Sequence, residues 1–242
     1  MFDKVLASVR IGAAAVDTRL DQDTVRPGET LSTQVVVEGG EVAQDIEGIE
    51  LELKTRRETG DASDTYELTE EHVTDSFTIE EDERRVFEAD LHVPHETPIT
   101  TVEAKRGRSP KVWVDTDLAI DQAIDADDTD SLAVEPTAPI QAMLDAVENA
   151  GNRLKEVTVD DDRIGVDDER ANYPVDQEFV FKPHDGDYTE AEIHFLPRDT
   201  VTHVLVEFDY RIHSEQFYSL RISHDNYTVE ELQREFERLA SE

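Results

Sequence analysis

The sequence predicts a mainly β protein with an N-terminal β-sandwich, a short helical connector, and a smaller C-terminal β domain that ends in an α-helix. Three observations carry this prediction. Apolar and polar residues alternate in many short runs, turn-forming residues separate those runs, and helical periodicity is confined to two segments. Alternation with period two places one face of a strand in a core and the other in water. Many such strands with no helix between them are typical of a β-sandwich.

The N-terminal strands are expected in five runs. These are residues 7–11, 31–37, 49–53, 87–93 and 112–120. Turn chemistry separates them, as in Pro27-Gly28 and Gly39-Gly40, because proline presets one backbone angle and glycine tolerates positive φ. We therefore assign residues 1–134 to the β-sandwich domain.

Residues 135–152 are expected to form a linker and a helix. Pro136 and Pro139 mark the linker, and Gly151 stands where a glycine usually ends a helix. The apolar residues between them recur at the spacing of one helix face: Ile140, Met143, Leu144 and Val147.

Residues 153–242 are expected to form the smaller β domain, either a barrel-like sheet or a partial sandwich. Its candidate strands are residues 154–159, 177–181, 190–196, 203–212 and 217–222. A final helix is predicted because Thr228 and Glu231 have the spacing of a capping box. Its apolar stripe is Val229, Leu232, Phe236 and Leu239.

The chain is strongly acidic. Asp and Glu total 59 against 23 Lys and Arg, of which six are Lys, giving a formal net charge of −36. An acidic, lysine-poor composition is typical of proteins from a salt-saturated cytoplasm, so we expect a halophilic, archaeal source. The same charge argues against nucleic acid and anionic lipid surfaces as partners, since both would repel most of this surface.

The sequence has no cysteine, which excludes disulfides and Cys-ligated zinc. The N-terminus shows no signal-peptide pattern, and no run reaches the length of about 18 apolar residues that a transmembrane helix needs. We therefore expect a cytoplasmic protein without a membrane span.

Several segments resemble the sporulation-control protein family, relatives of arrestins found in bacteria and archaea. The resemblance covers nearly the whole chain and is carried by the order and spacing of residues 25–31, 35–40, 44–46, 49–55, 117–120, 127–130, 134–136, 177–183 and 206–211. It implies an arrestin-like N-terminal sandwich and a smaller C-terminal β domain. It also implies a cytoplasmic regulatory or scaffolding role, partners in cell-division or developmental machinery, and no catalytic residues.

No metal site, cofactor or catalytic residue is predicted. The acidic stretch 121–130 is expected to be a solvated loop, because an EF-hand starting at Asp125 would place Asp130 at the required glycine and Pro136 at the bidentate glutamate. The sequence contains no HExxH, GxSxG or P-loop motif. The histidines are expected to be surface or half-buried residues: His72, His92, His95, His184, His194, His203, His213 and His224.

Basic residues concentrate between residues 54 and 111. If neighbouring hairpins converge, they would form one cationic island that binds an acidic or phosphorylated peptide through bidentate arginine contacts. The alternative is that these side chains make local ion pairs, for example with Glu58, Glu81 and Glu83. The candidate partner-binding residues are Arg56, Arg57, Arg84, Arg85, Arg106 and Arg108.

The preferred function is a non-catalytic, cytoplasmic regulatory or scaffold protein that binds other proteins. An exposed edge strand of the sandwich would offer a second route, by strand addition. Two alternatives remain: a small-ligand binder or enzyme that uses a pocket of the C-terminal domain, and a structural module that depends on a divalent ion. The sequence leaves a homodimer open and does not identify the partner.

The charge predicts that the fold loses stability as salt falls. The Debye length grows from about 3 Å at 1 M salt to about 10 Å at 0.1 M, so repulsion among the acidic residues becomes less screened. We expect the melting temperature to fall across this range in a series of calorimetric scans. An unchanged melting temperature would contradict the halophilic interpretation.

Overall fold

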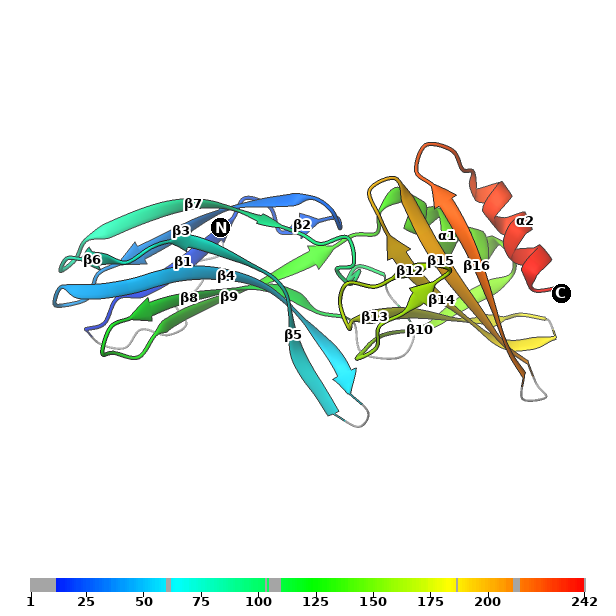
Figure 1. Cartoon of the computed structure of the whole chain (residues 1–242), viewed down its shortest axis with the longest axis horizontal. Helices are drawn as coiled ribbons and strands as arrows, with labels where there is room; N and C mark the ends of the chain where they lie inside the picture. The colour runs from blue at the N-terminus through cyan, green and yellow to red at the C-terminus, as the bar shows by residue number, and fades with distance from the viewer. Residues whose placement is uncertain are drawn as a thin grey trace.

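The computed structural model describes residues 12–59, 62–102, 104, 110–185, 187–210 and 214–241. The first half of the chain forms strands β1 (Ala15–Leu20), β2 (Thr24–Val25), β3 (Thr30–Glu38), β4 (Gln44–Thr59), β5 (Ala62–Thr74), β6 (Phe77–Ile79), β7 (Arg84–His92), β8 (Val112–Ile120) and β9 (Ala126–Val134). The second half forms α1 (Ala138–Asn149), β10 (Asn152–Asp160), β11 (Gly165–Val166), β12 (Glu169–Arg170), β13 (Asp176–Pro183), β14 (Tyr188–Pro197), β15 (Val201–Tyr210), β16 (Ser214–Ser223) and α2 (Val229–Leu239). Figure 1 shows the two halves side by side along the long axis.

The first half is a sandwich of two sheets. One sheet has the order β1-β3-β7, and the facing strands β4, β8 and β9 belong to the large second sheet. Alternate residues of β8 point into the core, as its burial pattern shows. The Thr18 and Thr116 hydroxyls hydrogen-bond at 2.7 Å across the sandwich, which satisfies two polar groups inside an apolar core.

The second half is an antiparallel sheet in the order β10-β13-β14-β15-β16, covered on one face by the two helices (Figure 1). Phe208 of β15 and Phe236 of α2 pack with ring centroids 5.3 Å apart. Phe179 and Phe181 of β13 are almost fully buried in the same core. The helices therefore occupy one face of the sheet, and the other face carries both polar residues and the apolar Leu196, which packs against Val166 of β11.

The prediction of a mainly β fold ending in a helix is confirmed, and so are the five C-terminal strands. The connector helix ends as expected, with Gly151 at a φ of +87°. The predicted capping box is present, because the Glu231 backbone N–H donates to the Thr228 hydroxyl at 3.2 Å. The predicted strand at residues 7–11 lies outside the described residues, and the boundaries at residues 134 and 152 stay predictions.

Five described strands of the first half lie outside the runs expected from the sequence: β1, β2, β5, β6 and β9. Residues 62–74 form strand β5, to which no strand was assigned, and the acidic stretch 121–130 is a loop only as far as residue 125. From residue 126 it forms β9, where Asp130 is buried together with Leu132. The Asp128 carboxylate accepts the Thr18 backbone N–H at 2.8 Å. Ladder bonds to β8 and this side-chain contact override the low strand propensity of aspartate.

Strand β4 connects the two halves. It pairs with β8 on one side and with β5 and β6 on the other, and its far end pairs in parallel with β10 at Glu58 and Asp160. As a result, one sheet of 11 strands runs from β2 in the sandwich to β16 in the second half.

Side chains reinforce this junction. The Glu96 carboxylate, which is almost buried, accepts bonds from the Asn172 backbone N–H at 2.8 Å, from its side-chain amide at 2.9 Å, and from Arg198 at 2.7 Å. The side-chain amide of Gln177 exchanges two 2.8 Å bonds with the backbone of Ile99. The two halves are therefore held by charge-assisted bonds as well as by the shared sheet.

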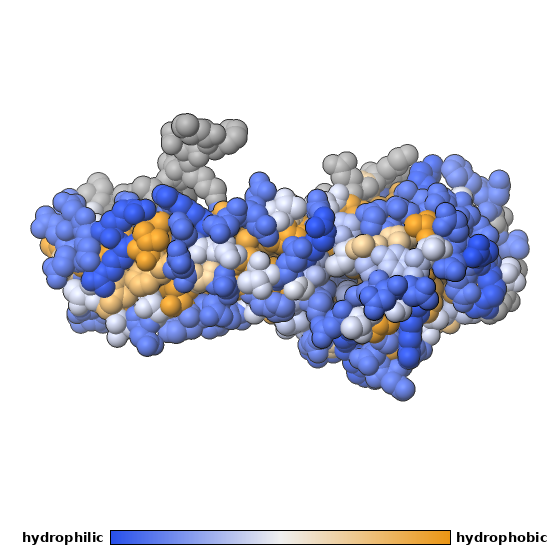
Figure 2. All heavy atoms as spheres, turned by 90° about the horizontal axis from the view of Figure 1, so that it is seen from above, coloured by the Kyte–Doolittle hydropathy of each residue, from blue (hydrophilic) through white to orange (hydrophobic). Residues whose placement is uncertain are grey.

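The face seen in Figure 2 is mostly hydrophilic, with smaller apolar areas between the polar residues. The large apolar side chains that the structure leaves exposed are Val42, Val86, Ile124 and Phe217. Within the described ranges, no helix combines the length and apolar character needed to cross a membrane.

Replacing Glu96 with alanine should destabilise the protein by about 2–4 kcal/mol, because Arg198 and the backbone donors at the junction lose their acceptor. Urea unfolding at molar salt measures this. Exposed Glu81 is the matched control, and Glu81→Ala should change the free energy of unfolding little. Equal effects of the two substitutions would contradict the role assigned to Glu96.

Candidate functional sites

The structure separates the predicted basic residues. Arg56 and Arg57 lie near the end of β4, whereas Arg84 and Arg85 begin β7. The start of β7 follows β6, which pairs with the beginning of β4. At about 3.3 Å per residue, the eleven or so residues of β4 between these places span roughly 36 Å. Arg106 and Arg108 lie outside the described residues, so the described arginines do not form one island.

Arg57 is a structural residue of the junction. Its guanidinium binds both carboxylate oxygens of Asp64 at 2.9 and 3.1 Å, donates to Asp161, and donates to the Pro174 carbonyl at 2.8 Å. It also lies 4.5 Å from the centroid of the Tyr66 ring. These contacts tie the β4–β5 hairpin to the second half, which leaves little of the guanidinium for a partner.

Arg84 and Arg85 make local ion pairs. Arg84 lies 3.8 Å from Glu38, and Arg85 binds Glu83 at 2.7 Å and lies 5.0 Å from the Phe77 ring centroid. These pairs match the alternative stated from the sequence, and one of the three carboxylates named there, Glu83, takes part. Partner binding by either arginine stays a prediction.

Arg56 differs from the other three. Its side chain is exposed, and no carboxylate of the described residues forms an ion pair with it. It lines a groove of about 620 Å³ together with Lys111, Trp113 and residues of β9. The lining therefore presents two cations and an indole ring, together with one acidic residue, Asp23.

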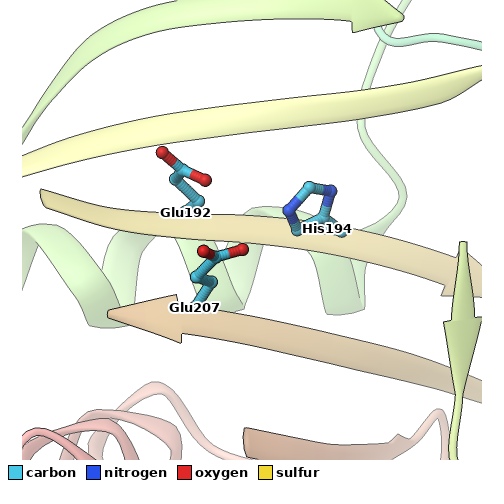
Figure 3. Close-up of side chains that lie close together, drawn as sticks. All are labelled: Glu192, His194 and Glu207. Carbon is cyan, nitrogen blue, oxygen red and sulfur yellow. The ribbon is translucent and has the colours of Figure 1, made fainter. Parts of the chain in front are cut away.

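A second group of polar residues lies on the C-terminal sheet, on the face opposite the helices. Glu192 and His194 are two residues apart on β14, so their side chains point to the same face. The register places Glu192 directly opposite Glu207 of β15, and His194 opposite Glu178 of β13. The donor atoms of Glu192, His194 and Glu207 lie within 4.8 Å of one another (Figure 3). We call these three residues and Glu178 the His194 cluster.

His194 is held in place by a buried carboxylate. Its Nδ1 is 2.9 Å from Asp176, and both side chains are about nine-tenths buried. Leu196 and Leu205, its neighbours on this face, are covered by the β11–β12 hairpin. In Figure 3 one ring nitrogen lies on the side of the two glutamates, and the other faces away. Because Nδ1 is bonded to Asp176, Nε2 is the nitrogen available to a ligand.

The cluster is short of positive charge. Among the described residues, neither Glu178, Glu192 nor Glu207 forms an ion pair with Lys or Arg, although Lys155 and Lys182 bind nearby Glu190 at 2.8 and 3.1 Å. Burial and the Glu192 carboxylate raise the pKa of Glu178 to about 7. Burial also raises the pKa of Glu192 and Glu207.

His194 responds to the same carboxylates. Burial lowers the pKa of its imidazole, but the bond to Asp176 and the nearby Glu178 outweigh burial, so the net shift is upward. The cluster can therefore bind protons near neutral pH, or a cation in their place.

Two other candidate sites, a cluster of glutamates and a cavity, have weaker support. Glu52, Glu67 and Glu70 also lie close together, but the ammonium of Lys54 is already paired with Glu52 and with Asp115, the latter at 2.9 Å. The cavity between the two halves, lined by Glu96, Asp176 and Phe179 among others, has a volume of about 30 Å³. That is the room of about one water molecule, so this cavity does not support the small-ligand alternative.

The His194 cluster was not predicted from the sequence. The histidines were expected at the surface or half-buried, whereas His194 and His203 are buried inside the sheet region. A usable signal was the alternation of Glu190, Glu192 and His194 with apolar residues, which predicts a polar strand face. The register that opposes Glu192 to Glu207 could not be read from the chain. Asp176 gave no separate signal among 59 acidic residues.

The fold and these surfaces define a two-lobed, mainly β protein. The family described as "SpoOM protein" matches residues 2–212. The sporulation-control protein spo0M of Bacillus subtilis strain 168 is 37% identical over 223 residues, covering 87% of this chain and 81% of that protein. The crystal structure of Spo0M from Bacillus subtilis superposes with a TM-score of 0.81 and 32% identity, covering 96% of this chain and 99% of that one. The chain belongs to the SpoOM protein family, which confirms the resemblance found in the sequence.

The raised pKa of Glu178 predicts a pH-dependent stability. A carboxyl whose folded pKa of about 7 exceeds its ordinary value of 4.5 stabilises the fold below pH 4.5, and this contribution is lost as the pH rises through 7. Glu178→Gln stays neutral, so its melting temperature should exceed that of the wild type at pH 8 and the difference should shrink toward pH 5. Scans in EDTA measure this. The control Glu148→Gln removes an exposed charge and should not change the slope, and parallel curves for Glu178→Gln and wild type would contradict the shift.

Proposed function

We propose that this chain is a non-catalytic, cytoplasmic regulatory protein that acts as a scaffold or adaptor, binding other proteins through its N-terminal sandwich. Membership of the SpoOM family supports the regulatory part, since the Bacillus relative is named as a sporulation-control protein. The observation that carries the binding part is the groove beside Arg56.

The groove has the chemistry of a peptide-binding surface. Its volume of about 620 Å³ accommodates several side chains, and Trp113 offers apolar area at its wall. Arg56 and Lys111 are exposed. Since no carboxylate in the described part of the chain pairs with Arg56, its guanidinium can bind a carboxylate or phosphate in bidentate geometry. On a chain with a net charge of −36, these two cations favour an acidic or phosphorylated segment of a partner in this groove.

A second pair of candidate arginines provides a matched comparison. Arg84 and Arg85 carry the same charge as the groove cations but lie at the other end of the sandwich, where they bind Glu38 and Glu83. A partner attracted only by positive charge would respond to loss of either pair. A partner seated in the groove would respond only to Arg56 and Lys111.

The proposal predicts a partner that depends on the groove. Tagged full-length protein is incubated with host lysate at molar salt, and co-purifying proteins are quantified by mass spectrometry. Arg56→Ser with Lys111→Ser should reduce capture of a specific partner about tenfold or more, since a charged hydrogen bond contributes about 1.5–3 kcal/mol.

The control Arg84→Ser with Arg85→Ser should leave capture of that partner unchanged. Circular dichroism at the same salt establishes that both double variants are folded. Capture that is unaffected by the groove substitutions, or lost equally in both double variants, would overturn this proposal.

A further inference from the structure

We propose that the His194 cluster is a binding site for one divalent transition-metal ion, with Glu192, His194 and Glu207 as protein ligands and Asp176 as the residue that positions the imidazole. This inference is independent of the groove and of the partner proposed above. Its grounds are the donor set, the orientation of His194 and the missing counter-charge.

The donor set matches such an ion. Two carboxylates and one imidazole offer oxygen and nitrogen ligands, and all three donor atoms already lie within 4.8 Å of one another. Zn²⁺ binds these ligand types at about 2.0–2.2 Å, so the two glutamates close on an ion by rotating their side chains. Both glutamates are half-buried rather than fully buried, which leaves them room to do so.

The backbone supports the geometry. Glu192 and Glu207 are a directly opposed pair on β14 and β15, and His194 follows Glu192 on the same face. Like charges placed opposite each other on a sheet destabilise it. A cation bound between the two carboxylates attracts both of them and offsets their repulsion. A bound ion would therefore explain why two glutamates are paired here.

His194 is the second, independent observation. It is nine-tenths buried, its Nδ1 is bonded to the buried Asp176, and its Nε2 has no hydrogen-bond partner among the described residues. A carboxylate that holds one ring nitrogen and presents the other to an ion is the usual outer shell of a histidine ligand. The same nitrogen can carry a proton toward the two carboxylates, so a proton and a metal ion compete for this position.

The site has room for further ligands. Three protein donors leave a tetrahedral ion one open position, which water or a partner side chain can fill. Phe217 of β16, opposite Glu207 in the register and exposed, borders the same open face. The imidazole and the mixed donor set favour Zn²⁺ or Mn²⁺ over Ca²⁺, which takes six to eight oxygen ligands.

The test is titration of full-length, EDTA-stripped protein with Zn²⁺ alone, in 1 M KCl so that diffuse attraction to the acidic surface is screened. We expect one Zn²⁺ per chain by calorimetry. Titration with Co²⁺ should give visible absorption bands of a tetrahedral site. Binding should weaken as the pH falls, because protons compete for the carboxylates and the imidazole.

The variants separate this site from general acidity. Glu207→Gln should lower the Zn²⁺ affinity at least tenfold, and Asp176→Asn should lower it about 10–100-fold by releasing the imidazole. Glu70→Gln is the matched control, since it removes one charge from the other acidic cluster, and it should leave the affinity unchanged. Melting temperatures without metal establish that each variant is folded.

Three outcomes would overturn the proposal. They are the absence of a 1:1 Zn²⁺ complex in the wild type, an affinity that Glu207→Gln and Asp176→Asn leave unchanged, and an equal loss in Glu70→Gln. Zn²⁺ should stay bound in the presence of an equal concentration of Ca²⁺, since Ca²⁺ takes six to eight oxygen ligands.

Discussion

The shared strand β4 is the constraint on which the rest of the structure depends. It hydrogen-bonds with four other strands: β5, β6, β8 and β10. The pairing of its last residues with β10 continues the sheet from the sandwich into the second half. Since β10 begins the order of the C-terminal sheet, the position of β13, β14 and β15 follows from this junction. Arg57 and Glu96 secure the junction with charged hydrogen bonds that bridge the two halves.

The distribution of charge follows from where cations are available. With 23 basic residues for 59 acidic ones, most carboxylates must face water. Where a carboxylate is partly buried, a cation or a backbone N–H usually donates a hydrogen bond to it. Arg198 does so to Glu96, and the Thr18 N–H does so to Asp128. The His194 cluster departs from this pattern, because its half-buried glutamates face one another. That departure is the physical basis for proposing a bound cation there.

The two candidate surfaces belong to different halves and ask for different ligands. The Arg56 groove is open, cationic and bordered by an indole ring, which suits an acidic segment of a protein. The His194 cluster is small and anionic, and it lies next to the two leucines that the β11–β12 hairpin covers. One sheet contains strands of both halves. A ligand at either surface therefore binds to the same continuous sheet.

The sequence by itself determined the class of fold, the C-terminal strands and both helices, because alternation, helical spacing and capping are local properties. It also identified the family and the excess of acidic residues. Only the tertiary structure decided that Arg57 is a junction residue, that Arg56 lines a groove, and that residues 126–134 form a strand. It alone assembled Glu192, His194 and Glu207, since the opposition of two strands depends on register. Register is set by pairing between distant segments, and a linear pattern of residues does not contain it.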